Sequence, residues 1–571
     1  MLQIISGKFF TSTDRHVHEA KGITYANYGW IGPIETTVAT LEPVGGLTIG
    51  VSPFVICYTN QIEKDDQARK TSLIRTGDAE IVRQFECLAT FGLKSFFGGD
   101  RWEIAFACRA AARDSSDQSV PQRFVPRFFA THNMGNVEEV EAFRTLVDKV
   151  VGLPRKEYLA VITTLETFCH ALRVLSHNVN MAYTLRVYCL ESLSQQFDQY
   201  KPVWEDYQDS IRHELDEVLA NVEAEAATQV RSALLRASSL RLQRRFTDFV
   251  QAHITDAFFV EQAAGREQAL RPSELGRALK NTYTIRSRYV HMLEPIPHYL
   301  RLLQLPAADV FRWDSEPYLT FGGLLRVVHH VIGQFIEKGE YLEREDYNWR
   351  QHLPGIITLK LAPQAWIWHT QGFQADHAVA RLSGFLGMYQ EFLTDSKPVV
   401  DLSDLMREYE RVLPCAEKKD KIPMLALYRL FNALAPPDKR SPSYEAIIRR
   451  EQRLYAECAV EMLVVRMLLE ETIPWSLEEC TKAVETFHRQ RFGRRVVTLP
   501  VLIELALITW LANGHLRAGD RSEYDRWARM GYLEVTGIEV VQRHIQTQVA
   551  KGAAFDPVWI GTRCRVTGET K

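Results

Sequence analysis

The stretch NTYTIRSRYVHMLEP, residues 281–295, holds an arginine and a histidine separated by four residues. Metal-independent RNA cleavage needs a group of near-neutral pKa that moves a proton between the 2′-hydroxyl and the leaving 5′-oxygen. Histidine, with an unperturbed pKa of about 6.5, suits this role. The reaction also needs a permanent cation beside the phosphate, and arginine offers the phosphate oxygens a planar fork of donors. Arg286 and His291 are therefore candidate catalytic residues.

The spacing of the two residues is a weak signal by itself. Because the chain has 17 histidines, roughly one arginine five positions before a histidine is expected by chance. A second such pair does occur, Arg127 and His132 in RFFATH. That pair lies in an aromatic segment that we expect to be extended, so we interpret it as the chance occurrence. Arg286 instead lies late in a predicted helical region, three residues after Tyr283.

The pattern Y-x2-RS-x3-H at 283–291 is followed by an apolar amphipathic segment, GGLLRVVHHVIGQFIEKG, at 322–339. This arrangement resembles the HEPN superfamily, and most of all its large Apea-like branch. Ribonucleases of that superfamily carry an R-x4-6-H motif near the end of a helical bundle. The resemblance covers roughly residues 137–340 and rests on few residues. The antitoxin-paired HEPN toxins have a tyrosine two places after the histidine, where this chain has Leu293.

The resemblance implies a site shared by two chains. Residues five apart on a regular helix lie about 140° apart around its axis, so Arg286 and His291 of one chain do not share a face perfectly. Their convergence would need the arginine at the start of the helix or a partner chain that completes the site. HEPN nucleases pair two motifs across a dimer, and we expect a homodimer or larger assembly here. The resemblance implies no metal and no other cofactor.

Basic residues near the motif could guide RNA toward it. The predicted RNA-binding residues are Arg277, Lys280, Tyr283 and Arg288. On the preceding helix, Arg241, Arg244 and Arg245 could extend the phosphate track. A solvated, charged helix face is the ordinary alternative for all of these cations.

Composition limits the function classes. The 571 residues carry a formal net charge of −3, with 46% hydrophobic and 24% charged residues, so RNA contact would be local rather than that of a basic nucleic-acid coat. The chain lacks a Walker A loop, a dinucleotide-binding glycine fingerprint, HExxH and GxSxG. The nine cysteines form no CxxC pair, which is typical of reduced thiols. We expect a cytoplasmic protein without membrane contact, because the most apolar window, 501–511, is too short to span a bilayer.

Two histidine groups offer a metal-dependent alternative. His16 and His18 precede Glu19, and His329 adjoins His330. The spacing implies no further ligand for either group, so we interpret these histidines as surface or packed residues.

Hydrophobic periodicity predicts an α+β protein that is mainly α. Residues 1–135 are expected to form a β-rich domain, in which RWEIAFACRA (101–110) alternates like a strand. Residues 136–340 begin at a capping pattern, Asn136 with Glu139, and are expected to form a HEPN-like helical bundle. One long helix is expected from Trp204 onward. Residues 341–571 are expected to form an irregular helical domain with a capping box at SLEE, 476–479.

These features favour a metal-independent endoribonuclease of HEPN type, which the resemblance implies would be a prokaryotic toxin or anti-phage effector. Its substrate would be RNA, and the flanking domains would respond to a protein or phage-derived trigger. The alternative is a non-catalytic, HEPN-like interaction or regulatory protein. A third hypothesis, less favoured by the sequence, is a metal-dependent enzyme that uses the N-terminal histidines.

Overall fold

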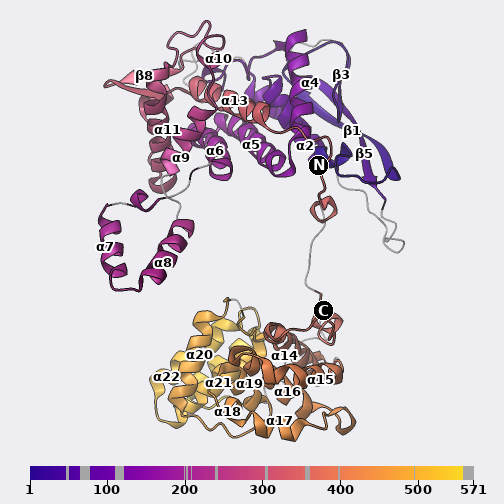
Figure 1. Cartoon of the computed structure of the whole chain (residues 1–571), viewed down its shortest axis with the longest axis vertical. Coiled ribbons are helices and arrows are strands. Elements are labelled where there is room, and N and C mark those ends of the chain that lie inside the picture. The colour runs from indigo at the N-terminus through magenta and orange to yellow at the C-terminus, as the bar shows by residue number, and fades with distance from the viewer. Residues whose placement is uncertain are drawn as a thin grey trace. The chain divides into compact units, whose positions relative to one another are not determined.

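The computed structural model describes most of the chain. The described residues are 1–46, 50–64, 78–109, 121–198, 200, 203–207, 209–237, 242–302, 307–353, 361–395, 399–493 and 495–556. They form two compact units, residues 1–357 and 358–571, and each is considered separately (Figure 1). A small sheet and a helical remainder confirm the predicted α+β, mainly α class.

The N-terminal sheet is built around two long antiparallel strands. β1 (Arg15–Ala26) pairs along its whole length with β5 (Ser52–Glu63). The five strands run in the order β3-β4-β5-β1-β6, and residues along β5 alternate between buried and half-buried, as expected for a strand with one covered face. The other strands of this sheet are β3 (Ile34–Glu35), β4 (Thr40–Pro43) and β6 (Phe97–Gly98). β2 (Tyr28–Gly29) and β7 (Asn133–Met134) form a separate parallel pair.

The prediction of a strand at 101–110 is wrong. Arg101–Ala107 forms helix α3, and the side chain of Asp100 caps it by accepting from the backbone N–H groups of Trp102 and Glu103. Trp102 and Phe106 are exposed, so their alternation did not mark a buried face. The local capping interaction decides the structure here.

The helical part of the first unit forms around α4 (Val137–Gly152), α5 (Arg155–Arg173), α6 (Val179–Phe197), α9 (Leu242–Ala252), α11 (Pro272–Met292) and α13 (Phe321–Lys338). Asn136 caps α4 as predicted, because its side chain accepts from the N–H of Glu139. The expected domain boundary at 135/136 lies inside one continuous hydrophobic core that runs from Met1 to Leu353. The sheet and the bundle therefore share a core, with α2 (Ala79–Gly92) between them in contact with α4 and α5.

Further elements complete the first unit. They are α1 (Leu2–Ile5), α7 (Asp209–Leu219), α8 (Ala224–Ala237), α10 (Asp256–Phe259), α12 (His298–Leu302), β8 (Val310–Trp313) and β9 (Glu316–Leu319). The single long helix expected from Trp204 is two helices, α7 and α8, joined at 220–223. The β8–β9 hairpin lies between α11 and α13 in sequence and packs against α11.

The second unit is wholly helical in its described part. It comprises α14 (Ala378–Asp395), α15 (Ser403–Val412), α16 (Lys418–Leu434), α17 (Tyr444–Arg450), α18 (Gln452–Tyr455), α19 (Val460–Leu468), α20 (Leu477–Gln490), α21 (Val501–Arg517), α22 (Arg521–Glu534) and α23 (Glu539–Lys551). The capping box predicted at Ser476 and Glu479 is present. A separate hydrophobic core holds this unit together.

One segment of the described chain, Arg155–Ser176, is long and apolar enough to cross a membrane by length and composition. Of its 18-residue apolar window, 56% is buried inside the protein. Packing within a protein core accounts for such a composition, so the segment is weak evidence for a membrane span.

Candidate functional site

The guanidinium of Arg286 lies inside the bundle, where its partner comes from another helix. Arg286, on α11, donates from Nη2 to Glu191 Oε2 on α6, and the two side chains are only 9% and 4% exposed. An arginine matches a carboxylate well at close range, so each group neutralises the charge that burial would otherwise penalise.

Two tyrosines complete this buried cluster. The guanidinium carbon of Arg286 lies 4.5 Å from the ring centre of Tyr188 and 5.3 Å from that of Tyr283. Tyr283 donates its hydroxyl to Glu191 Oε1 at 3.3 Å. Burial, and then the charge of Glu191, raise the pKa of Tyr283 to about 12. Tyr283 therefore stays a neutral donor, and its predicted contact with RNA has to compete with a contact inside the protein.

His291 lies in the last turn of α11 and is exposed. It has exposed apolar neighbours, Val290, Met292 and Leu293. Leu293 ends the helix with a φ of 55°, a left-handed conformation that favours glycine or asparagine. The end of α11 thus presents an imidazole surrounded by aliphatic side chains to solvent.

The two motif residues therefore occupy different environments. Arg286 is enclosed by α6, whereas His291 faces solvent beyond the end of the core. One chain supplies an accessible proton-transfer group and an almost enclosed cation. It does not by itself form a cleft with both groups facing a phosphate.

Most of the predicted RNA-binding cations have acidic partners. Arg277 donates to both carboxylate oxygens of Glu316, at 2.5 and 2.6 Å, and Arg288 lies 3.5 Å from Glu294. Lys280 is exposed and forms no ion pair within the described part of the chain. These three side chains remain near the surface and could exchange their partners for phosphate.

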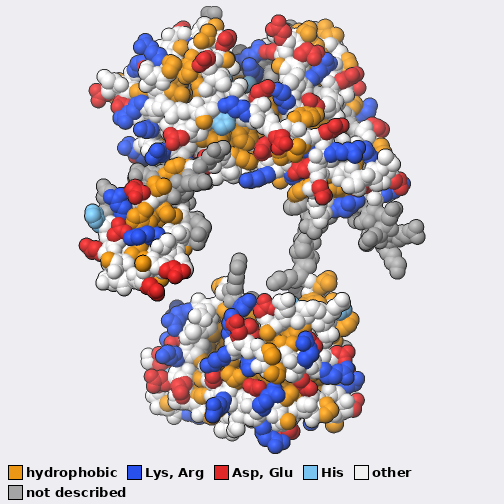
Figure 2. Space-filling model, viewed as in Figure 1, with side chains coloured by type: hydrophobic (Ala, Val, Ile, Leu, Met, Phe, Trp, Pro, Cys, Tyr) orange, Lys and Arg blue, Asp and Glu red, His pale blue; other side chains and the backbone are white. Residues whose placement is uncertain are grey.

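The track expected on the preceding helix is also partly neutralised. Arg245 pairs with Asp198 at 2.5 Å and Arg244 with Asp248 at 3.4 Å, and Arg241 lies outside the described residues. On the face drawn in Figure 2, basic and acidic side chains of the described residues are interspersed rather than separated. This mixture agrees with the net charge of −3.

The second arginine–histidine pair has structural contacts of its own. Arg127 forms an ion pair with Glu139 at 2.5 Å, and His132 Nε2 lies 3.1 Å from the sulfur of Met134. The two residues therefore contact different neighbours.

The histidines considered as metal ligands do not converge. His329 Nε2 donates to the carbonyl of Phe91 at 3.0 Å, whereas His330 bonds with Gln262 and Thr255. His16 and His18 lie on β1. The parts of the chain that the structure describes hold no group of three or more His, Cys, Asp or Glu residues that could bind a metal ion.

Glu191 is the site residue that the sequence analysis missed. It lies in VYCLESL, where Val187, Leu190 and Leu193 are apolar residues at nearby helical positions. An acidic residue on the apolar face of a helix predicts a buried cationic partner. That signal could have been recognised, although the identity of the partner could not.

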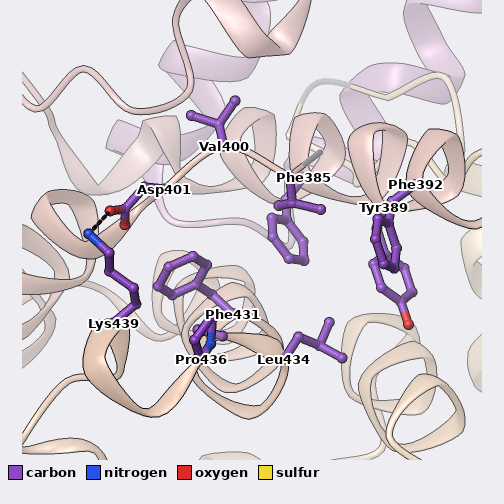
Figure 3. A pocket seen from close by; sticks show the side chains of 11 residues that line it. Phe385, Tyr389, Phe392, Val400, Asp401, Phe431, Leu434, Pro436 and Lys439 are labelled. Atoms are coloured by element: carbon purple, nitrogen blue, oxygen red, sulfur yellow. Dashed lines mark ion pairs between the residues drawn. The ribbon is translucent and has the colours of Figure 1, made fainter. Parts of the chain in front are cut away.

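The second unit contains an apolar cavity of about 360 Å³ (Figure 3). Phe385, Tyr389 and Phe392 follow one another along α14, with ring centres 6.3 and 6.2 Å apart. At one end of the cavity, Asp401 and Lys439 form an ion pair at 2.8 Å. The size suits a small ligand, but Asp401 and Lys439 are the only charged groups among the described lining residues, and they pair with each other. The lining therefore indicates no particular ligand chemistry.

Comparison with known proteins found no matching family model, no similar curated protein and no similar solved structure.

Proposed function

We propose that the chain is a metal-independent endoribonuclease of HEPN type, in which Arg286 and His291 of two copies form a site on RNA. The proposal combines the resemblance at 283–291 with the placement of the two residues on one helix. It includes a cytoplasmic location and a role as a toxin or anti-phage effector, with a protein or phage-derived trigger.

The observation that carries the proposal is the state of Arg286. Its Nε is buried and has no hydrogen-bond acceptor within the described structure. A buried unpaired donor costs about 1–3 kcal/mol, and an incoming phosphate oxygen would satisfy it. Glu191 and the two tyrosines hold the guanidinium in one orientation, so little ordering is needed when charge develops on the phosphate.

His291 would carry the proton transfer. In its neutral form, it accepts the proton of the 2′-hydroxyl while the 2′-oxygen attacks phosphorus and the bond to the 5′-oxygen breaks. His291 of the second copy, in its protonated form, gives a proton to that 5′-oxygen. The products are a 2′,3′-cyclic phosphate and a 5′-hydroxyl, and no water is consumed in this step.

The experiment is cleavage of end-labelled RNA by the purified full chain, with and without EDTA. We expect His291→Ala to abolish cleavage and EDTA to leave it unchanged. His298→Ala is the matched control, because His298 is also exposed and lies seven positions further along. Full activity in His291→Ala would contradict the proposal. Loss of activity in EDTA would favour a metal-dependent enzyme.

A second candidate function rests on a different observation. The exposed Val290, Met292 and Leu293 give the end of α11 the character of a docking surface, and the ion pair with Glu191 explains Arg286 as a structural residue. In a non-catalytic interaction protein, His291→Ala would change no RNA in cells, while substitutions of these aliphatic residues would abolish the biological effect.

A further inference from the structure

The first unit contains a cavity of about 420 Å³ between the sheet-bearing part and the bundle. Its walls come from the end of α2, the segment 124–128, the loop after α10 and the first half of α13. The lining residues are Lys94, Phe124, Val125, Pro126, Arg127, Phe128, Gln262, Arg266, Gly322, Leu325, Arg326 and His329. This volume is in the range of small-molecule sites in proteins.

The charge of this lining is strongly one-sided. Lys94, Arg127, Arg266 and Arg326 line the cavity, and no Asp or Glu is among the described residues that line it. Two carboxylates that are not among the described lining residues form ion pairs with these cations. Asp309 pairs with both Arg266 and Arg326, and Glu139 pairs with Arg127. Among the described residues, four cations therefore share two carboxylates around a space that could hold an anion.

Asp309 fixes two of the cations in place. Its side chain is almost fully enclosed and accepts from Nε of Arg326 at 3.0 Å, from Nε of Arg266 at 3.0 Å and from the backbone N–H of Leu270 at 3.1 Å. A Cβ at Gly323 would lie 2.0 Å from the carbonyl oxygen of Asp309, so the close approach of α13 to this residue requires glycine. The two guanidinium groups are therefore held in a defined orientation, which lowers the cost of ordering them around a ligand.

Lys94 differs from the three arginines. It is exposed and forms no ion pair within the described part of the chain. It follows the end of α2 with a φ of 47°, a conformation in which lysine is disfavoured relative to glycine. Burial, and then the charge of Lys94, lower the pKa of His329 to about 3, so this imidazole is neutral and adds no positive charge. Lys94 is thus a cation at the cavity with no acidic partner among the described residues.

We propose that this cavity binds a nucleotide, with its phosphates on Lys94 and the Arg266–Arg326 pair and its base against Phe124, Pro126 and Phe128. Lysine and arginine donors match phosphate oxygens, and flat apolar side chains match a base. The wall residues come from both the N-terminal part and the bundle, so an occupied cavity would connect the two. The inference is independent of the proposed nuclease.

The test uses the purified full chain and isothermal titration with ATP, inorganic triphosphate and adenosine. We expect saturable binding of ATP, weaker binding of triphosphate and no binding of adenosine at the same concentration. Lys94→Ala should weaken ATP binding about tenfold, which is the usual contribution of one charge-assisted contact. Lys21→Ala, at an exposed lysine on β1, should leave binding unchanged.

Each remaining outcome would overturn the proposal. Absence of ATP binding to the folded chain would show that the cavity is not a nucleotide-binding site. Equal losses in Lys94→Ala and Lys21→Ala would show nonspecific attraction of a polyanion. Triphosphate binding as tightly as ATP would show that the apolar lining does not contact a base. If a short RNA bound through Lys94 while ATP did not bind, Lys94 would be part of an RNA-binding surface, and the cavity would not be a site for a free nucleotide.

Discussion

Glu191 on α6 and Arg286 on α11 form a buried ion pair, although 95 residues separate them in sequence. The pair joins two helices of the bundle and has Tyr188 and Tyr283 around it. The arginine that the sequence marks as a candidate catalytic group is therefore also a structural group. Stability and activity must be measured together at this position.

Replacing Glu191 should destabilise the first unit. Glu191→Gln would remove the charge that compensates Arg286, and breaking one side of a buried ion pair costs about 3–5 kcal/mol. Urea unfolding should show a lower free energy of unfolding. Glu294→Gln is the control, because its pair with Arg288 is exposed and contributes less than about 1 kcal/mol. Equal effects of the two substitutions would contradict a buried pair.

Substitutions at the motif should separate stability from catalysis. His291→Ala should leave the free energy of unfolding within about 0.5 kcal/mol of the wild type, because His291 is exposed. Arg286→Ala should lower it by about 3 kcal/mol or more, since Glu191 would be left unpaired. Urea unfolding checks both values. If RNA cleavage is lost in His291→Ala while stability is unchanged, the histidine acts in catalysis rather than in folding.

The sequence predicted those features of the structure that depend on residues close together in the chain. The capping residues Asn136 and Ser476 fixed two helix starts correctly because a cap needs only the next three residues. Alternation at 101–110 failed as a strand signal, since so short a segment can equally form a helix, which the cap at Asp100 starts here. The shared core across residue 135 arises from contacts between distant segments, which periodicity does not report.

In the candidate site too, features set by neighbouring residues were predictable, and features set by the packing of distant segments were not. The motif at Arg286 and His291 could be found from residue type and spacing, and so could the helix that carries it. The pairing of Arg286 with Glu191 could not be predicted from the sequence, because it depends on how α6 packs against α11. The cationic cavity could not be predicted either. Its wall joins Lys94, Arg127 and Arg326, which are far apart in the sequence.

Two buried histidines predict a loss of stability in acid. Burial, followed by Arg326 and Lys338, lowers the pKa of His330 from 6.5 to about 4. The unfolded chain binds a proton first as the pH falls, so the stabilisation is complete above about pH 6.5 and declines toward about pH 4. The slope is at most about 1.4 kcal/mol per pH unit for each such histidine.

Urea unfolding at about pH 7 and about pH 5 measures this dependence. His330→Gln should reduce the difference in unfolding free energy between the two pH values, and His329, whose pKa burial also lowers to about 3, should account for part of the remainder. The control His298→Gln changes an exposed side chain and should leave the difference as in the wild type. An unchanged difference in His330→Gln would contradict the assignment.

The second arginine–histidine pair should be dispensable for cleavage. His132→Ala should leave the rate within a few-fold of the wild type, because His132 contacts Met134 rather than Arg127. Arg127→Ala removes an ion pair with Glu139 and should have a similarly small effect on the rate. The measurement is the initial rate on labelled RNA. Complete loss in both variants would move the nuclease site to this segment.

The last prediction concerns assembly. Leu293 is 76% exposed and has a φ of 55°, so it combines a strained backbone with an apolar side chain that the described residues of its own chain leave uncovered. A two-fold contact through the ends of two α11 helices would bury Val290, Met292 and Leu293 and bring both copies of His291 together. Such a contact would be self-complementary and would complete the site that one chain leaves open.

Leu293→Gly tests this contact without introducing strain. In the monomer, glycine relieves the left-handed conformation, so the free energy of unfolding should not fall. In the dimer, the lost aliphatic contact should weaken self-association, and RNA cleavage should fall with it at low protein concentration. Mass measurement in solution across a dilution series, together with the cleavage rate, checks both effects. Val260→Gly is the control at an exposed aliphatic residue outside α11. A strictly monomeric wild type that cleaves RNA at full rate would exclude the shared site, because one chain would then be sufficient.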